Sequence, residues 1–308
     1  MREKEWKLAD ASLYYETETG QGKESVRITR FQGPGSRVKV PELIGGLPVT
    51  VIDRKAFLSK KNLRRISLPD SVEEIGDWAF AYCDHLTEVI LPHRAVRFGK
   101  AVFMECKELR RISVISAEGQ LSDKPVAAFP GELLAAAVTA MDAAYLLDME
   151  AAGTKEWLDK WDARLKNVLR TSDQEGFSKQ ILCGEEDYGS TDLNAYMSGR
   201  RKEKVRLIFL RLLSDQGLSP LLRRELEDYL RAHTKGENSD ETWQVILREH
   251  GDDREYYQLF AAISCVTEGN LNDILADIGE EHQEMKAYFL RYREEVFGAA
   301  DFFAGLEL

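Results

Sequence analysis

The sequence predicts an α+β protein, in which a short β-rich solenoid is followed by an all-α helical bundle or a short α-solenoid. Two observations predict this fold class. One sequence motif occurs three times with a period of 23 residues, beginning at Ile52, Ile75 and Phe98. A fixed period in the twenties is typical of a solenoid, whose units bury their apolar sides by stacking. Beyond residue 131 the apolar residues recur instead at a spacing of about 3.6, which indicates helices.

The stretch before the repeats is expected to close one end of the solenoid. Residues 13–19 and 26–31 are rich in β-branched and aromatic side chains, and Gly20 and Gly22 mark a turn between them. The first coil of a stack leaves an unpaired sheet edge above an exposed core. We therefore expect a hairpin or paired strand here that covers the first coil.

Within the three repeats, apolar side chains occupy matching positions, which we expect to point inward. The first matching set is Phe57, Phe80 and Phe103. Each unit then has an L-x-x-I-x-L segment, in which a short strand alternates inward and outward side chains. The inward sets are Leu63, Leu86 and Leu109, then Ile66, Val89 and Ile112, then Leu68, Leu91 and Val114. Pro69 and Pro92 follow the first two strands and end them, because proline has no N–H to donate.

These motifs resemble the BspA-like class of leucine-rich repeats, which occurs in many bacterial and some protist proteins. The resemblance covers roughly residues 26–115 and includes I-x-x-x-A-F, L-x-x-I-x-L-P and a cysteine three residues after the phenylalanine, at Cys83 and Cys106. Lys60 replaces that cysteine in the first unit, and Ile115 replaces the proline after the third strand. The resemblance implies a β-rich solenoid that binds other macromolecules, often at a cell surface.

A length of 308 residues favours two domains. We expect residues 1–115 to form the leucine-rich repeat domain with its capping strands, 116–131 a linker and 132–308 an α-helical domain. The apolar pattern from Leu133 to Leu147 predicts a buried helix that caps the last coil. Helix starts are predicted at Ser219, at Asn238 with Glu241, and at Thr267. From about Asp252 the helices weakly resemble degenerate ankyrin-type pairs, without the T-P-L-H motif.

Charge and composition limit the kinds of partner and the cellular location that we expect. The net charge is −11, and residues 131–308 carry 21 basic against 35 acidic residues. Binding to nucleic acid requires clustered Lys and Arg, so we expect no nucleic-acid partner. The sequence contains no run of about twenty apolar residues, so we expect no membrane-spanning helix. Residues 1–7 lack the apolar region of a secretory signal, and the four cysteines show no disulfide framework. We therefore expect a cytoplasmic protein, in contrast to the surface location of many relatives. The adhesin alternative requires export.

No stretch of the sequence has the motif of a known catalytic, metal or cofactor site. The acidic run 185–188 lacks the spacing of a calcium loop, and we interpret it as a solvated loop. The run 250–253 lacks the further histidine and aspartate of a metal-dependent phosphohydrolase, and we interpret it as a helix end followed by an acidic helix start. We expect no cofactor and no enzymatic activity; the alternative is an enzyme with a site between the 184–194 loop and the 250–254 turn.

The outward positions of the repeat strands form the candidate partner-binding surface. They align in three columns: Arg64, Thr87 and Arg110; Arg65, Glu88 and Arg111; Ser67, Ile90 and Ser113. The alternating charges of the second column predict a ladder of ion pairs, each worth well under about 1 kcal/mol when exposed. The alternative is a basic recognition face around an exposed Ile90, a mixture found at interface hot spots.

Two further features leave alternatives open. Trp78 aligns with Lys55 and Ala101, and either fills a gap on the outer side of its coil or binds a partner. Cys83 and Cys106 are expected to be neighbours in adjacent coils, as a structural ladder of thiols or as a redox pair. The function that we predict is a non-enzymatic scaffold that binds a protein partner; an enzyme and an exported surface adhesin are the alternatives.

Overall fold

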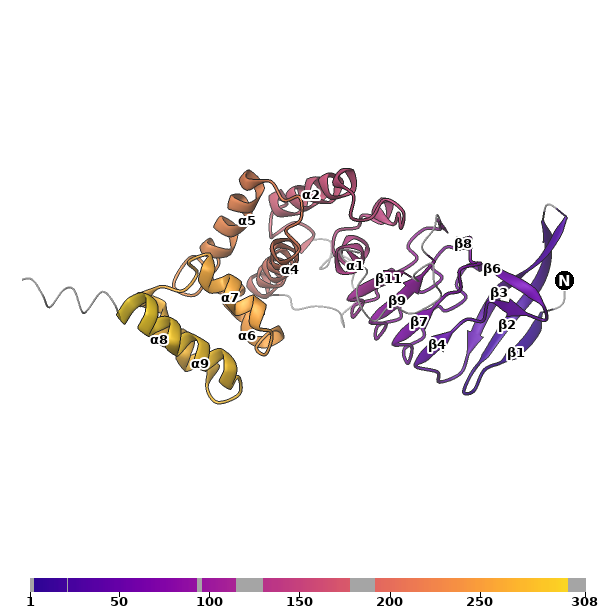
Figure 1. Ribbon diagram of the computed structural model, residues 1–308, viewed down its shortest axis with the longest axis horizontal. Coiled ribbons are helices and arrows are strands. Elements are labelled where there is room, and N and C mark those ends of the chain that lie inside the picture. The colour runs from indigo at the N-terminus through magenta and orange to yellow at the C-terminus, as the bar shows by residue number, and fades with distance from the viewer. Residues whose placement is uncertain (1–2, 21, 93–95, 115–129, 178–191, 299–308) are drawn as a thin grey trace, which may run out of the picture. The chain divides into compact units, whose positions relative to one another are not determined.

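The computed structural model describes residues 3–20, 22–92, 96–114, 130–177 and 192–298. The chain divides into two compact units, Met1–Val168 and Leu169–Leu308 (Figure 1). The first unit contains all the described strands and the first helices, and the second is helical. This order of elements confirms the predicted α+β class.

The repeats form two parallel sheets, and each coil contributes one strand to each sheet. One set comprises β6 (Leu47–Ile52), β8 (Glu74–Ile75) and β10 (Arg97–Phe98), with the two-residue strand β5 (Leu43–Ile44) antiparallel to β6. The other sheet has the order β11-β9-β7-β4, from Arg111–Val114, Glu88–Leu91, Arg65–Ser67 and Arg37–Lys39. Ile75 lies opposite both Ile52 and Phe98, which confirms the 23-residue period.

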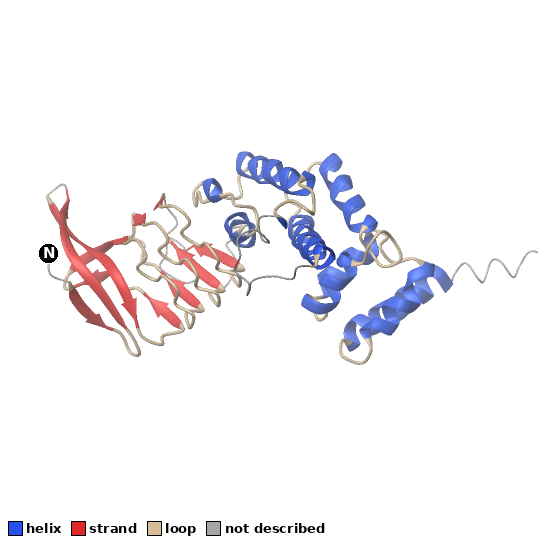
Figure 2. Ribbon diagram, turned by 180° about the vertical axis from the view of Figure 1, so that it is seen from behind, coloured by secondary structure: helices blue, strands red, loops and turns tan. Residues whose placement is uncertain are grey.

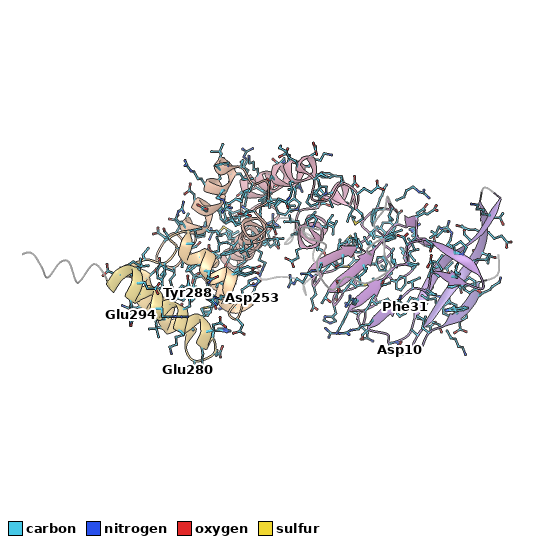
Figure 3. All side chains as sticks on the ribbon, viewed as in Figure 1. Asp10, Phe31, Asp253, Glu280, Tyr288 and Glu294 are labelled. Carbon is cyan, nitrogen blue, oxygen red and sulfur yellow. The ribbon has the colours of Figure 1, made fainter. Side chains whose placement is uncertain are left out.

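A row of stacked phenylalanine rings runs through the core of the coils. The centroids of Phe57 and Phe80 lie 5.1 Å apart, and those of Phe80 and Phe103 lie 5.6 Å apart. This stack confirms the predicted inward column. Phe31 adds a fourth ring, 5.1 Å from Phe57, although it precedes the repeats; Figure 3 labels it among the side chains of the first unit.

The predicted hairpin is present and covers the first coil. Strands β2 (Ser12–Gly20) and β3 (Lys23–Gln32) are antiparallel, and β3 pairs in parallel with β6. A further strand, β1 (Lys4–Lys7), pairs with β2. After β3 the chain passes very close to itself at Gly33, where a Cβ atom would lie 2.6 Å from the Cα of Ala11 and where φ is +134°. Only glycine fits this close approach without strain.

The other end of the β11 sheet is covered by α1 (Gly131–Thr139), as predicted. Glu132 accepts a hydrogen bond from the Arg111 guanidinium at 2.7 Å, and a Cβ atom on Gly131 would lie 2.6 Å from the carbonyl oxygen of Ile112. The side chain of Trp161, on α2 (Lys155–Arg170), donates to the carbonyl of Leu133 at 3.0 Å. These contacts tie α1 to the end of the solenoid and α2 to α1.

The prediction of one helix from Leu133 to Leu147 is wrong. The α-helix ends at Thr139, Asp142 has a left-handed φ of 49°, and a 3₁₀ helix, η1, covers Ala144–Leu146. Tyr145, predicted to face inward, is 65% exposed. The apolar pattern continues past the end of the helix because Met141, in the turn, and Leu146, in η1, are both buried.

Because α1 and α2 pack with the solenoid, the compact units divide at Val168 and Leu169. The sequence instead placed the division at the 116–131 segment. Residues 116–129 of that segment lie outside the described residues, so the predicted linker remains a prediction.

The second unit is a bundle in which α4 (Leu193–Leu213) packs against α5 (Pro220–Ala232), α6 (Glu241–Glu249) and α7 (Arg254–Ala262). Helix α9 (Gln283–Tyr292) packs against α7 and α8 (Glu268–Ile278), and continues as a π-helix, η2 (Arg293–Phe297). The core is aromatic, with the ring of Trp243 against those of Phe260 and Phe289. None of the described helices combines the length and the hydropathy that a membrane crossing requires.

The helix starts were predicted with mixed success. The Ser219 side chain accepts from the N–H of Leu222 at the start of α5, and Thr267 forms a capping box with Asn270 at the start of α8. The capping box predicted from Asn238 and Glu241 is wrong. Helix α6 begins at Glu241 after Asp240, which makes no side-chain cap, and the Glu241 carboxylate lies 3.6 Å from Arg201.

Candidate interaction surface

The outward side chains of the β11-β9-β7-β4 sheet form the surface that we call the strand face. Figure 2 shows these strands in red among the tan turns of the first unit. Its members are Arg37, Lys39, Arg64, Arg65, Ser67, Thr87, Glu88, Arg110, Arg111 and Ser113. Parallel pairing places Arg37 beside Arg65, Arg65 beside Glu88, and Glu88 beside Arg111. The strands therefore bring together the residues that the sequence assigned to this surface, except Trp78 and the buried Ile90.

The predicted ladder of ion pairs is present in part. Arg65 Nε lies 3.1 Å from a carboxylate oxygen of Glu88, and the Ser113 hydroxyl donates to the other oxygen at 2.8 Å. Arg111 forms its ion pair with Glu132 on α1 at 2.7 Å. Glu88 is thus occupied from both neighbouring strands, and these partly exposed pairs each contribute less than about 1 kcal/mol to stability.

The expectation of an exposed apolar centre at Ile90 is wrong. Its side chain is 1% exposed, and it continues a buried run with Val89 and Leu91. Strand alternation determines the direction of a side chain but not whether other groups cover it. Ile90 belongs to β9, a central strand between β7 and β11, and is part of the buried interior.

Four cations on the strand face have no ionic partner among the residues that the structure describes. They are Arg37, Lys39, Arg64 and Arg110, and all four are exposed. Arg37 and Lys39 were not predicted for this surface, because β4 precedes the first complete repeat. Their signal is the alternation of Arg37, Val38 and Lys39, in which Val38 aligns with the buried Ile66.

Trp78 lies in the turn between β8 and β9, where its backbone has a left-handed φ of 54°. Arg54 and Lys55, from the preceding coil, place their cations 4.9 Å and 5.4 Å from the centre of the indole ring. The side chain is half-buried. These cation–π contacts support the interpretation that Trp78 fills the outer side of its coil, and a role in binding remains a prediction.

The two cysteines of the repeats form a structural ladder. The thiols of Cys83 and Cys106 are free and buried, and each donates to a carbonyl of the preceding coil, Phe57 or Phe80, at 3.1 Å. Burial raises the pKa of Cys83 to about 11 and that of Cys106 to about 12. Because redox chemistry requires the thiolate, these values favour the structural alternative.

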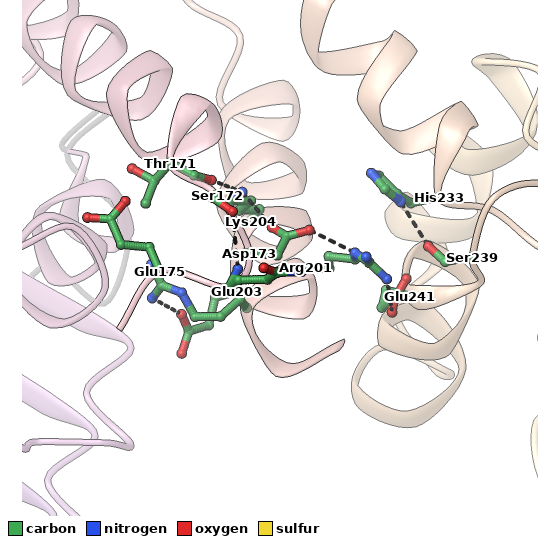
Figure 4. A network of polar contacts seen from close by, with 12 residues as sticks. Thr171, Ser172, Asp173, Glu175, Arg201, Glu203, Lys204, His233, Ser239 and Glu241 are labelled. Carbon is green, nitrogen blue, oxygen red and sulfur yellow. Dashed lines mark hydrogen bonds and ion pairs between the residues drawn. The ribbon is translucent and has the colours of Figure 1, made fainter. Parts of the chain in front are cut away.

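A polar cluster in the second unit was not predicted (Figure 4). Asp173 accepts hydrogen bonds from Lys204 at 2.7 Å and from Arg201 at 2.8 Å, and a second nitrogen of Arg201 lies 3.6 Å from buried Glu241. Burial by itself would raise the pKa of Asp173, but the bonds from Lys204 and Arg201 outweigh it and lower the pKa. The cluster joins the segment after α2 to α4 and α6, and sequence spacing carries no signal for it.

Of the two regions proposed for an alternative enzymatic site, the structure describes the 250–254 turn but not most of the 184–194 loop. The acidic run 185–188 lies outside the described residues. His250 follows the last residue of α6, its Nδ1 atom lies 2.8 Å from Asp253, and its ring stacks on Tyr256 at 3.6 Å. This arrangement confirms the interpretation as a helix end. Among the described residues, no three His, Cys, Asp or Glu side chains are placed to share a metal ion.

Comparisons with solved structures give matches to part of the chain. A leucine-rich repeat protein from T. pallidum is 35% identical over 32% of this chain and 46% of its own, with a TM-score of 0.30. A leucine-rich repeat protein from Bacteroides capillosus is 25% identical over 39% of this chain and 88% of its own, with a TM-score of 0.31. A leucine-rich cell surface protein from Faecalibacterium prausnitzii is 25% identical over 36% and 32%, with a TM-score of 0.29.

The match thus spans less than half of the T. pallidum protein. A comparison with curated proteins found no match. The sequence model of the family described as "BspA type Leucine rich repeat region (6 copies)" matches residues 42–129. These residues include the repeats with the stacked phenylalanines. The repeat region of this chain is a BspA-type leucine-rich repeat.

Proposed function

We propose that this protein is a non-enzymatic scaffold whose strand face binds a protein partner. The observation that carries the proposal is the row of exposed cations on one side of a sheet whose other side packs in the buried core of the coils. Arg37, Arg64 and Arg110 have no ionic partner among the described residues. Arginine is enriched at the energetic centres of interfaces, and a preorganised backbone lowers the entropic cost of binding.

Site-specific photo-crosslinking in the native cell tests this proposal. A photoreactive amino acid replaces Arg64 or Arg110 on the strand face, and Lys100 in the turn that follows β10 serves as the control position. We expect covalent adducts of one defined mass from Arg64 and Arg110 and none from Lys100. Adducts from Lys100 alone would move the interaction to the turns that carry Trp78 and contradict the proposal, as would the absence of adducts at every position.

We further propose that the protein acts in the cytoplasm of a bacterial cell. The described cysteines, Cys83, Cys106 and Cys265, are free and buried, which suits a reducing compartment. Fractionation of intact cells tests this location. Accessibility of the protein to protease added outside the cells would favour the surface adhesin instead.

A further inference from the structure

The strand face is most basic at the end formed by β4 and β7. We call this group the basic corner: Arg37 and Lys39 on β4, Arg65 at the start of β7, and Arg64 directly before β7. Parallel pairing places Arg37 directly beside Arg65. The N–H groups of Arg64 and Arg65 both donate to the carbonyl oxygen of Ser36, at 2.8 Å and 3.0 Å. The backbone therefore holds the two arginine-bearing segments close together.

The described residues do not neutralise the basic corner. Its one anionic partner is Glu88, which lies 3.1 Å from Arg65 and also accepts from Ser113. Arg37, Lys39 and Arg64 have no ion pair in the described part of the chain. Like charges directly opposite each other on neighbouring strands are destabilising. The pair formed by Arg37 and Arg65 is therefore repulsive; Glu88 pairs with Arg65 but not with Arg37, and an external anion would relieve the repulsion that is left.

We infer that the basic corner binds an acidic segment of the partner protein, through carboxylates that bridge the side chains of Arg37, Lys39 and Arg64. This inference rests on the proposed binding role of the strand face and names the chemistry of its partner. Guanidinium groups bind carboxylates through two parallel hydrogen bonds. Neighbouring strands lie about 4.8 Å apart, so carboxylates along one extended segment can reach cations on both strands.

The surroundings favour a protein segment over nucleic acid. Glu88, on β9, borders the basic corner and would repel a row of phosphates that continued across the sheet, whereas a short acidic segment along β4 and β7 stops before it. The described strand-face positions contain no aromatic side chain on which a base would stack. The chain carries a net charge of −11, which opposes the approach of a long polyanion. A short acidic segment meets only the local positive charge.

Binding of charged probes to the full-length protein tests the inference. The probe is a fluorescent octaglutamate peptide, compared with a neutral glycine–serine peptide of equal length and a single-stranded DNA of equal charge. We expect octaglutamate to bind, to weaken steeply as salt rises, and to bind tighter than both comparison probes. Equal binding of the neutral peptide, or tighter binding of the DNA, would overturn the inference.

Matched charge reversals locate the binding. We expect R37E with K39E to weaken octaglutamate binding at least tenfold, and K100E with K107E, which make the same charge change outside the strand face, to weaken it less than threefold. Equal loss in both variants would show an effect of net charge alone and overturn the inference. Circular dichroism confirms that each variant is folded.

A readout without any ligand uses the neutral change R37Q. It removes the repulsion toward Arg65, so we expect a higher melting temperature at low salt and a smaller difference at high salt. A lower melting temperature would contradict the repulsion on which the inference depends. If photo-crosslinking succeeds from Arg64 and Arg110 while octaglutamate fails to bind, the scaffold function stands and the acidic partner does not.

Discussion

Phe80 occupies the centre of the aromatic stack, with Phe57 on one side and Phe103 on the other. Its side chain is fully buried. Truncation to alanine leaves a cavity between two coils, so we expect Phe80→Ala to lower the free energy of unfolding by about 3–5 kcal/mol. Denaturant titration measures this change. Tyr82→Ala, at a 43% exposed residue of the same coil, is the control and should have less than half the effect.

The thiols of the repeats predict a loss of stability at alkaline pH. The pKa values of Cys83 and Cys106 are raised from 9.0 to about 11 and about 12. Between pH 9 and these values the unfolded chain loses its thiol protons while the folded chain keeps them. Stability is therefore intact below pH 9 and declines above it, with a limiting slope of about 1.4 kcal/mol per pH unit for each thiol.

Comparison with a C83A/C106A variant isolates this effect from the titration of lysines and tyrosines. We expect the free energy of unfolding of the variant to fall less steeply between pH 9 and pH 11, as measured by urea titration. Equal slopes would show that the two thiols ionise alike in the folded and unfolded chains.

Among the individual helices, α8 has the most completely satisfied start. The Thr267 hydroxyl accepts from the N–H of Asn270 at 3.3 Å, and the Asn270 side chain accepts from the N–H of Thr267 at 2.8 Å. We expect Thr267→Ala to destabilise the second unit by about 1 kcal/mol. Thr267→Ser keeps the hydroxyl and is the control; thermal unfolding of both variants would reveal no difference if the cap contributed nothing.

Elements that repeat were predictable from the sequence, because three aligned copies identify the inward positions at Phe57, Phe80 and Phe103. Elements that occur once were less so. The end of α1 depends on the left-handed turn at Asp142, which the uninterrupted apolar pattern hides. At the start of α6, Glu241 lies 3.6 Å from Arg201, which is 40 residues earlier in the chain. Long-range ion pairs of this kind leave no periodic trace in a sequence.

The candidate site was predicted only in outline. The columns of Arg65, Glu88 and Arg111 follow from the strand register, which the repeats determine. The burial of Ile90 does not follow from it, because covering groups can come from any part of the chain. Arg37 and Lys39 were missed because their strand belongs to a coil too divergent to align.

At the scale of the whole molecule, the first compact unit extends through α1 and most of α2, to Val168. We expect a fragment of residues 1–168 to fold cooperatively, because it keeps the helix that covers β11. A fragment of residues 1–114 exposes that end of the sheet, and we expect it to melt at a lower temperature or to aggregate. Circular dichroism melting and size-exclusion chromatography of the two fragments decide this, and equal behaviour would contradict the capping role of α1.

The hairpin before the first coil and the helix after the last one have a consequence for how this protein can vary. Every interior coil accepts the same backbone bonds from one neighbour and offers the same bonds to the other, so extra copies can be spliced in without redesigning either terminus. Duplication of residues 53–75 would give a longer rod with one more row of outward side chains. The surface available to a partner would then lengthen by about 4.8 Å, one inter-strand spacing, for each added coil.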